Sequence, residues 1–163
     1  MLKKLKSDLV CVSAPKAAFI VLPAVAAVLG VLTWVTTGGV PFFWRVMRKP
    51  PFTPPLFVLF ALSVAAYLFF GFFAAICLGR RRDQPAPLIN SAAAFFFALF
   101  WCPLFFSAKC VVAASALLLS AAVLIPAAVS CGKFYASVFL AAVPLWALEA
   151  YFLYLTVGFA VLN

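Results

Sequence analysis

The sequence predicts an all-α integral membrane protein, a bundle of five transmembrane helices. Of its 163 residues, 69% are hydrophobic and only 9% are charged, whereas a soluble domain carries roughly 25% charged residues. The mean hydropathy is +1.25. The apolar residues form five runs, and a membrane helix needs about 20 such residues. The runs neither alternate like strands of a membrane barrel nor leave a polar face like a surface helix.

Charged and turn residues separate the five runs. The runs predict helices over about 17–36, 56–78, 88–107, 111–130 and 134–162. The first run follows a basic tail and is longer than the apolar part of a cleaved signal peptide, so we interpret it as a retained span. We therefore expect a single membrane domain over 1–163, whose longest loop, 37–55, joins the first two helices.

The formal net charge of +9 comes from short basic clusters at the ends of the apolar runs. Such clusters anchor helices at lipid headgroups, so the expected partner is the bilayer and not a nucleic acid. With five spans, one side of the membrane receives eight basic residues and the other side four. The eight are Lys3, Lys4, Lys6, Lys16, Arg80, Arg81, Arg82 and Lys133; the four are Arg45, Arg48, Lys49 and Lys109. This bias places the N-terminus in the cytoplasm, and we expect a bacterial cell membrane.

The reactive residue types are sparse. The chain has no histidine, which excludes catalysis by a Ser-His-Asp or Cys-His pair. The five cysteines form no CxxC motif, so we interpret them as buried free thiols. Neither a metal site nor a cofactor is expected, because the usual ligands are nearly absent.

The loop 37–55 ends in KPPFTPP, residues 49–55, with four prolines in seven residues. Proline fixes φ and keeps the residue before it extended, so this segment is a rigid, non-helical link. It either delivers Phe52 to a fixed place near the membrane surface or serves as a plain entry into the second helix at Pro55.

Three blocks of the chain resemble the TspO/MBR (translocator protein) family. The first, KPPFTPPLFVLFALSVAAYLFFG, follows the family pattern KPxWxPPxWxFxxVWxxLYxxxG without a gap. The positions that match are Lys49, Pro50, Pro54, Pro55, Tyr67 and Gly71, and phenylalanine replaces tryptophan at Phe52 and Phe57. A second block is WCPLFF at 101–106. A third begins at Pro144 and aligns Tyr151, Leu155, Leu162 and Asn163.

The resemblance implies a binding protein for a hydrophobic planar ligand, a tetrapyrrole such as protoporphyrin IX or a sterol-like molecule. The ligand would lie inside the bundle, with the loop 37–55 as its lid. The candidate ligand contacts are Trp44, Phe52, Phe57, Ser63, Tyr67, Ala98, Trp101, Trp146 and Glu149. The resemblance is compatible with a homodimer and with a transport or regulatory role.

Departures from the family pattern limit which functional properties the resemblance implies for this chain. Ser63 and Leu148 stand where the family has tryptophans linked to light-dependent porphyrin breakdown. Trp146 is two residues from the second of these positions, about 200° around a helix. Ala98 and Thr156 stand where the family has asparagines. We therefore expect a phenylalanine-rich pocket and no enzymatic porphyrin breakdown.

Glu149 is the only acidic residue inside a predicted span. A carboxylate at the bilayer centre costs on the order of 3 kcal/mol, so it normally faces the bundle interior or water. Trp146, Leu153 and Thr156 share its helix face by spacing. Three interpretations stay open: a protonated structural group, a contact to a cationic or hydrogen-bonding ligand, and a proton-coupling residue. The alternatives to a binding protein are a small transporter that depends on Glu149 and a membrane partner without a ligand.

Overall fold

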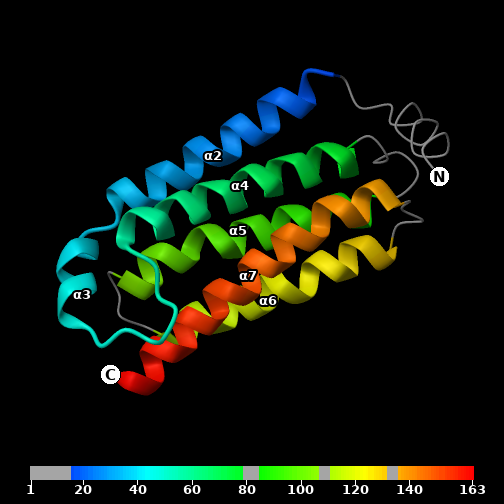
Figure 1. Ribbon diagram of the computed structural model, residues 1–163. Coiled ribbons are helices and arrows are strands. Elements are labelled where there is room, and N and C mark those ends of the chain that lie inside the picture. The colour runs from blue at the N-terminus through cyan, green and yellow to red at the C-terminus, as the bar shows by residue number, and fades with distance from the viewer. Residues whose placement is uncertain (1–15, 79–84, 107–110, 132–135) are drawn as a thin grey trace.

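The computed structural model describes residues 16–78, 85–106, 111–131 and 136–163. These residues form six helices and no strand. The helices are α2 (Ala18–Thr36), α3 (Val40–Val46), α4 (Leu56–Leu78), α5 (Ala86–Phe106), α6 (Val111–Cys131) and α7 (Ala136–Leu162). The five long helices run side by side, and the short α3 lies at the end of the bundle where the C-terminus also lies (Figure 1).

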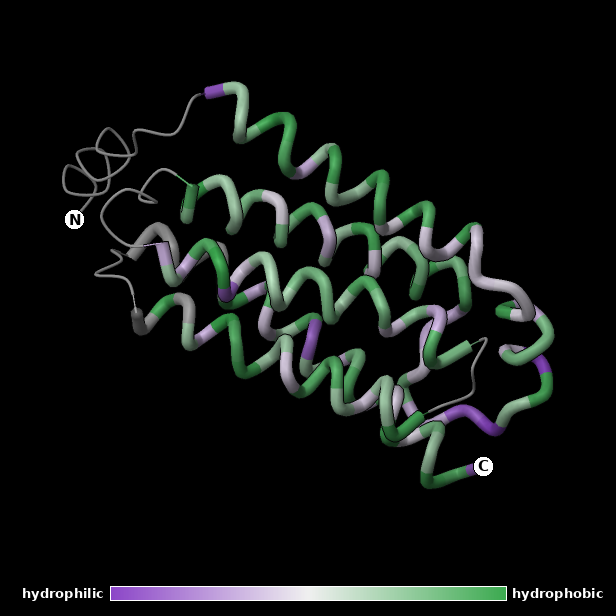
Figure 2. Tube along the Cα trace, turned by 180° about the vertical axis from the view of Figure 1, so that it is seen from behind, coloured by the Kyte–Doolittle hydropathy of each residue, from purple (hydrophilic) through white to green (hydrophobic). Residues whose placement is uncertain are grey.

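Four helices of the described chain are long and apolar enough to cross a membrane: α2, α4, α5 and α7 over Ala142–Leu162. In α6 the described apolar stretch, Val111–Ala127, is shorter. The all-helical class is confirmed, whereas the predicted count of five spans is not, because within the described residues four helices meet the length. Figure 2 shows hydrophobic colours along the long helices and a hydrophilic stretch in the connection between α3 and α4.

The predicted helix bounds lie within about two residues of the observed ones, but the loop 37–55 also contains α3. Gly39 precedes this helix with φ 80°, a left-handed conformation, and Pro41 lies in its first turn. Glycine adopts that φ without strain, and proline has the φ that a first turn needs. Phe43 and Trp44 of α3 are buried, so the helix is held by its apolar face.

The interior helix α4 packs against α2, α5 and α7, and α6 packs against α5 and α7. The contact between α2 and α4 is close at Gly71, where an added Cβ would lie 2.3 Å from the Cα of Pro23. Small residues permit such approaches in membranes, where helix association depends on van der Waals packing. On the outer face of α2, Ile20 and Val28 are exposed, as lipid-facing residues are.

Aromatic rings fill the end of the bundle beneath α3. Phe43 lies 5.2 Å from Phe105 and 5.3 Å from Phe106, measured between ring centroids. The indole of Trp44 lies 5.6 Å from the ring of Phe159 on α7. These offset and edge-to-face contacts are the arrangements that aromatic pairs prefer. Beside these rings a hollow of about 340 Å³ remains, lined by Gly38, Gly39, Phe42, Phe43, Val46, Met47 and Phe106.

Candidate functional site

A buried cavity lies among α4, α5, α6 and α7, and we call it the central chamber. Its lining residues are Ser63, Ala66, Tyr67, Ala98, Trp101, Leu118, Glu149 and Phe152. Its volume is about 10 Å³, which is room for one water molecule at most. Five of the nine predicted contacts meet here from three helices: Ser63, Tyr67, Ala98, Trp101 and Glu149.

Glu149 brings a carboxyl group to the wall of the chamber. Its side chain is 2% exposed, and its Oε2 atom is buried without a hydrogen-bond partner. The other charged residues of the described chain are Lys16, Arg45, Arg48 and Lys49, and all four are exposed. Buried polar atoms are nearly always paired, so an unpaired carboxyl oxygen marks a position that awaits a donor.

Tyr67 and Ser63 place two hydroxyl groups on the chamber wall from α4. The Tyr67 hydroxyl donates to the carbonyl of Ala98 on α5 at 3.4 Å, and the Ser63 hydroxyl donates to the carbonyl of Leu59 at 2.9 Å. The ring of Tyr67 fits against Gly30 of α2, where an added Cβ would lie 1.9 Å from ring carbon Cδ2. Glycine at this position therefore makes room for the tyrosine.

Trp101 joins α5 to α7 beside the chamber. Its indole nitrogen donates to the hydroxyl of Thr156 at 2.8 Å, and this hydroxyl donates to the carbonyl of Phe152 at 2.7 Å. The indole lies 5.0 Å from the ring of Phe152 and stacks on Phe105 at 5.6 Å. A third ring contact is with Phe106 at 6.0 Å, so one hydrogen bond and three ring contacts set its orientation.

The structure places the other four predicted contacts outside the chamber. Trp44 is buried against Phe159. Phe52 and Phe57 are 89% and 78% exposed. Trp146 is 52% exposed and donates to the carbonyl of Ala122 on α6 at 3.0 Å. The sequence predicts that Trp146 and Thr156 share a helix face with Glu149. In the structure Thr156 is buried, whereas Trp146 is exposed.

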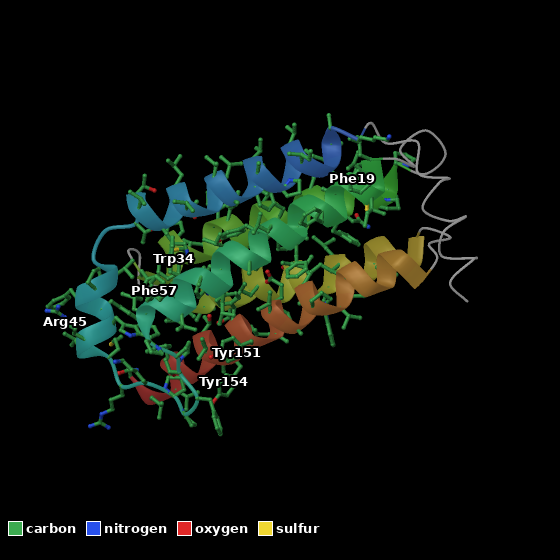
Figure 3. The ribbon with its side chains drawn as sticks, turned by 45° about the horizontal axis from the view of Figure 1, so that its top comes forward. Phe19, Trp34, Arg45, Phe57, Tyr151 and Tyr154 are labelled. Atoms are coloured by element: carbon green, nitrogen blue, oxygen red, sulfur yellow. The ribbon has the colours of Figure 1, made fainter. Side chains whose placement is uncertain are left out.

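A second hollow is an open groove of about 470 Å³ where α2, α3 and α4 meet. Its lining residues are Trp34, Val35, Thr37, Val40, Pro41, Leu56, Phe57 and Phe60. Trp34 and Phe57 approach this region from α2 and α4 (Figure 3). The indole nitrogen of Trp34 is buried without a partner. Phe57 thus lines a lateral groove and not the chamber.

The link 47–55 is fastened to α7 by three side chains, which we call the clasp. The hydroxyls of Tyr151 and Tyr154 donate to the carbonyls of Phe52 and Pro51 at 2.9 and 2.8 Å. The amide of Asn163 accepts from the backbone N–H of Arg48 at 2.8 Å and donates to its carbonyl at 3.0 Å. In Figure 3 both tyrosines extend from α7 toward this link, while Arg45 points away from the bundle.

Sequence reasoning missed three chamber residues: Ala66, Leu118 and Phe152. Phe152 lies three residues after Glu149, so helical spacing could have indicated it. Leu118 belongs to α6, a helix for which neither a motif nor a charge marked an inward face.

The remaining predictions concern reactive groups. Cys77 and Cys102 are buried free thiols, and the side chains of Cys11, Cys110 and Cys131 lie outside the described residues. Within the described ranges no three His, Cys, Asp or Glu residues gather. The chamber thus presents the unpaired Oε2 atom, two hydroxyls and an indole beside the ring of Phe152.

Comparison with known proteins identifies a family for the chain. The model of the TspO/MBR family matches residues 19–162, nearly the whole chain. A search of curated proteins finds no matching relative.

Proposed function

Because the chain belongs to the TspO/MBR family, we propose that it binds a hydrophobic planar ligand, such as a tetrapyrrole or a sterol-like molecule, in the central chamber. It is an integral, multi-pass membrane protein. The observation that carries the proposal is the convergence of Ser63, Tyr67, Trp101 and Glu149 on one buried cavity. Apolar binding sites typically combine such a wall with a few convergent polar groups.

A planar ligand needs more space than the chamber offers. Its rings must therefore replace protein rings, beginning with the contact between Trp101 and Phe152. Each protein aromatic pair that is lost is worth about 0.5–1.5 kcal/mol, and stacking of the ligand rings on the protein replaces this energy. The binding step thus requires that α5 and α7 part locally, and the proposed lid is the loop 37–55.

A titration of the detergent-purified protein with protoporphyrin IX tests this proposal, with quenching of tryptophan fluorescence as the readout. Ala98→Leu adds bulk to the chamber wall, and Ala92→Leu is the matched control on the exposed face of α5. We expect saturable quenching in the wild type and in Ala92→Leu, and at least about ten-fold weaker binding in Ala98→Leu, because overpacking costs 1–3 kcal/mol. Unsaturable quenching that is equal in all three proteins would refute the chamber site.

A transport function is the second candidate, and it rests on the buried carboxyl of Glu149. Intramembrane carboxyls often belong to substrate or proton pathways. This function predicts substrate flux into proteoliposomes that is lost in Glu149→Gln. Flux that is unchanged in this variant would remove the transport function, and absence of both flux and binding would leave a structural membrane partner.

We further propose that the N-terminus lies in the cytoplasm of a bacterial cell, because eight of the twelve basic residues would then lie on the inner side. Phe52 would face outward, and its side chain is exposed. In a cysteine-free background, Phe52→Cys should react with an impermeant maleimide on intact cells. Labelling only after permeabilisation would show that the orientation is the opposite one.

We also propose a homodimer, which light scattering in detergent can test.

A further inference from the structure

The hydrogen bonds among the described residues leave one fully buried side-chain atom of the chamber wall without a partner. The hydroxyls of Ser63 and Tyr67 donate to the carbonyls of Leu59 and Ala98. The indole of Trp101 donates to Thr156. The protons of these wall groups are therefore already used within the protein. The remaining polar group is the carboxyl of Glu149, whose Oε2 atom has no partner and is an acceptor when the carboxyl is ionised.

We propose that the chamber selects planar ligands that carry a cationic or N–H donor group, and that Glu149 Oε2 receives this group. This inference rests on the proposed function, because it names the chemistry of the ligand at the same site. While Glu149 is ionised, a ligand that offers only acceptors meets no unused donor in the wall and loses its own hydrogen bonds to water, which is costly in a buried site.

The charges of the molecule point to the same selection. Among the described residues Glu149 is the only acid, and the four basic residues are exposed and do not line the chamber. An ionised carboxyl accepts through both oxygens, and a protonated one still accepts through one of them. Glu149 can therefore receive a donor in either state, whereas a ligand carboxylate is disfavoured beside the ionised carboxyl.

For a tetrapyrrole this selection determines an orientation. The ring centre carries N–H groups, while edge substituents such as carboxylates are acceptors. The centre of the macrocycle should thus lie toward Glu149 and the carboxylate edge away from it. For smaller ligands the same rule favours an aromatic amine over an aromatic acid of the same shape.

Two planar probes of one tricyclic shape test the inference: 9-aminoacridine, which is a cationic donor, and acridine-9-carboxylate, which is an anion. Binding to the purified protein in neutral detergent is followed by probe fluorescence and by the shift in melting temperature. We expect the wild type to bind the amine at least about ten-fold more tightly than the acid, as charge-assisted hydrogen bonds allow. Non-specific electrostatic attraction cannot produce this preference for the amine, because the chain carries a net charge of +9 and would favour the anion.

Two variants connect the preference to the carboxyl. Glu149→Gln keeps the shape and loses the charge, so the preference should fall several-fold. Glu149→Leu removes every polar atom, and the ratio of the two affinities should fall to about one. The leucine variant is expected to fold, because an unpaired buried carboxyl is costly and leucine, of similar size, removes that cost. Its melting temperature verifies this.

The outcomes separate this inference from the proposed function. Protoporphyrin IX is titrated beside the acridines. If it binds and the wild type shows no preference for the amine, or if the preference survives in Glu149→Leu, the inference is overturned and the binding function stands. If neither protoporphyrin IX nor either acridine binds saturably to the wild type, both are overturned.

Discussion

At the scale of single residues, the hydrogen bond between Trp101 and Thr156 is the buried polar link between α5 and α7. Both side chains are nearly inaccessible, at 3% and 0% exposure. If the acceptor is removed, the indole N–H stays buried without a partner, which costs about 1–3 kcal/mol. Interhelical hydrogen bonds in membranes average nearer 0.6 kcal/mol, because the reference state also finds partners.

We therefore predict that Thr156→Val lowers the free energy of unfolding by about 1–2 kcal/mol. The measurement is unfolding in mixed micelles with increasing denaturing detergent. Thr36→Val is the matched control, since the hydroxyl of Thr36 is exposed and bonds only to carbonyls of its own helix. Equal losses in the two variants would show that the link to Trp101 adds no stability.

Several chamber residues could be predicted one by one, because the family pattern aligns residues 49–71 without a gap and a second block matches WCPLFF at 101–106. The position of Trp146 could not. A three-residue step rotates a helix by about 300°, so Trp146 and Glu149 share a broad face, yet Trp146 lies at its edge. The indole points outward to Ala122 because of the way α7 packs against α6. The sequence of α7 alone does not indicate how a neighbouring helix packs against it.

At the scale of elements, the clasp holds the link 47–55 on α7. Asn163 makes two hydrogen bonds to the backbone of Arg48, one as acceptor and one as donor. Its amide also donates to the carbonyl of Phe159 in the last turn of α7 at 2.9 Å. One side chain therefore both caps the helix and fixes the start of the link.

We predict that Asn163→Ala loosens this link and speeds tryptic cleavage after Arg48 about five-fold, since two exposed hydrogen bonds are worth on the order of 1 kcal/mol. Leu162→Ala, at a neighbouring exposed position, should leave the cleavage rate unchanged. The rate is read from the fragments by mass spectrometry. If both variants are cleaved like the wild type, the clasp does not restrain the link.

The sequence predicted the long helices well, because charges and prolines bound the apolar runs. It did not predict α3, whose seven residues are too few for a periodic signal. The aromatic residues of this loop divide between inside and outside: Phe43 and Trp44 are buried, whereas Phe52 is exposed with φ 60°. That division follows from the local backbone conformation, which composition does not reveal.

At the scale of the whole molecule, the bundle is closed around a chamber that holds one water molecule at most. The ring of Phe152 occupies space beside Trp101 that a planar ligand must take. Ligand affinity is therefore lowered by the cost of displacing this ring. A variant that lacks the ring should bind more tightly, although it is less stable.

The measurement that tests this account most directly is the protoporphyrin IX titration of Phe152→Ala beside the wild type. Phe96→Ala is the matched control, because Phe96 is 60% exposed on α5. Removal of the buried ring should destabilise the protein by about 3 kcal/mol and yet tighten ligand binding several-fold, while Phe96→Ala binds like the wild type. Equal affinities in all three proteins would contradict the account and place the ligand outside the chamber.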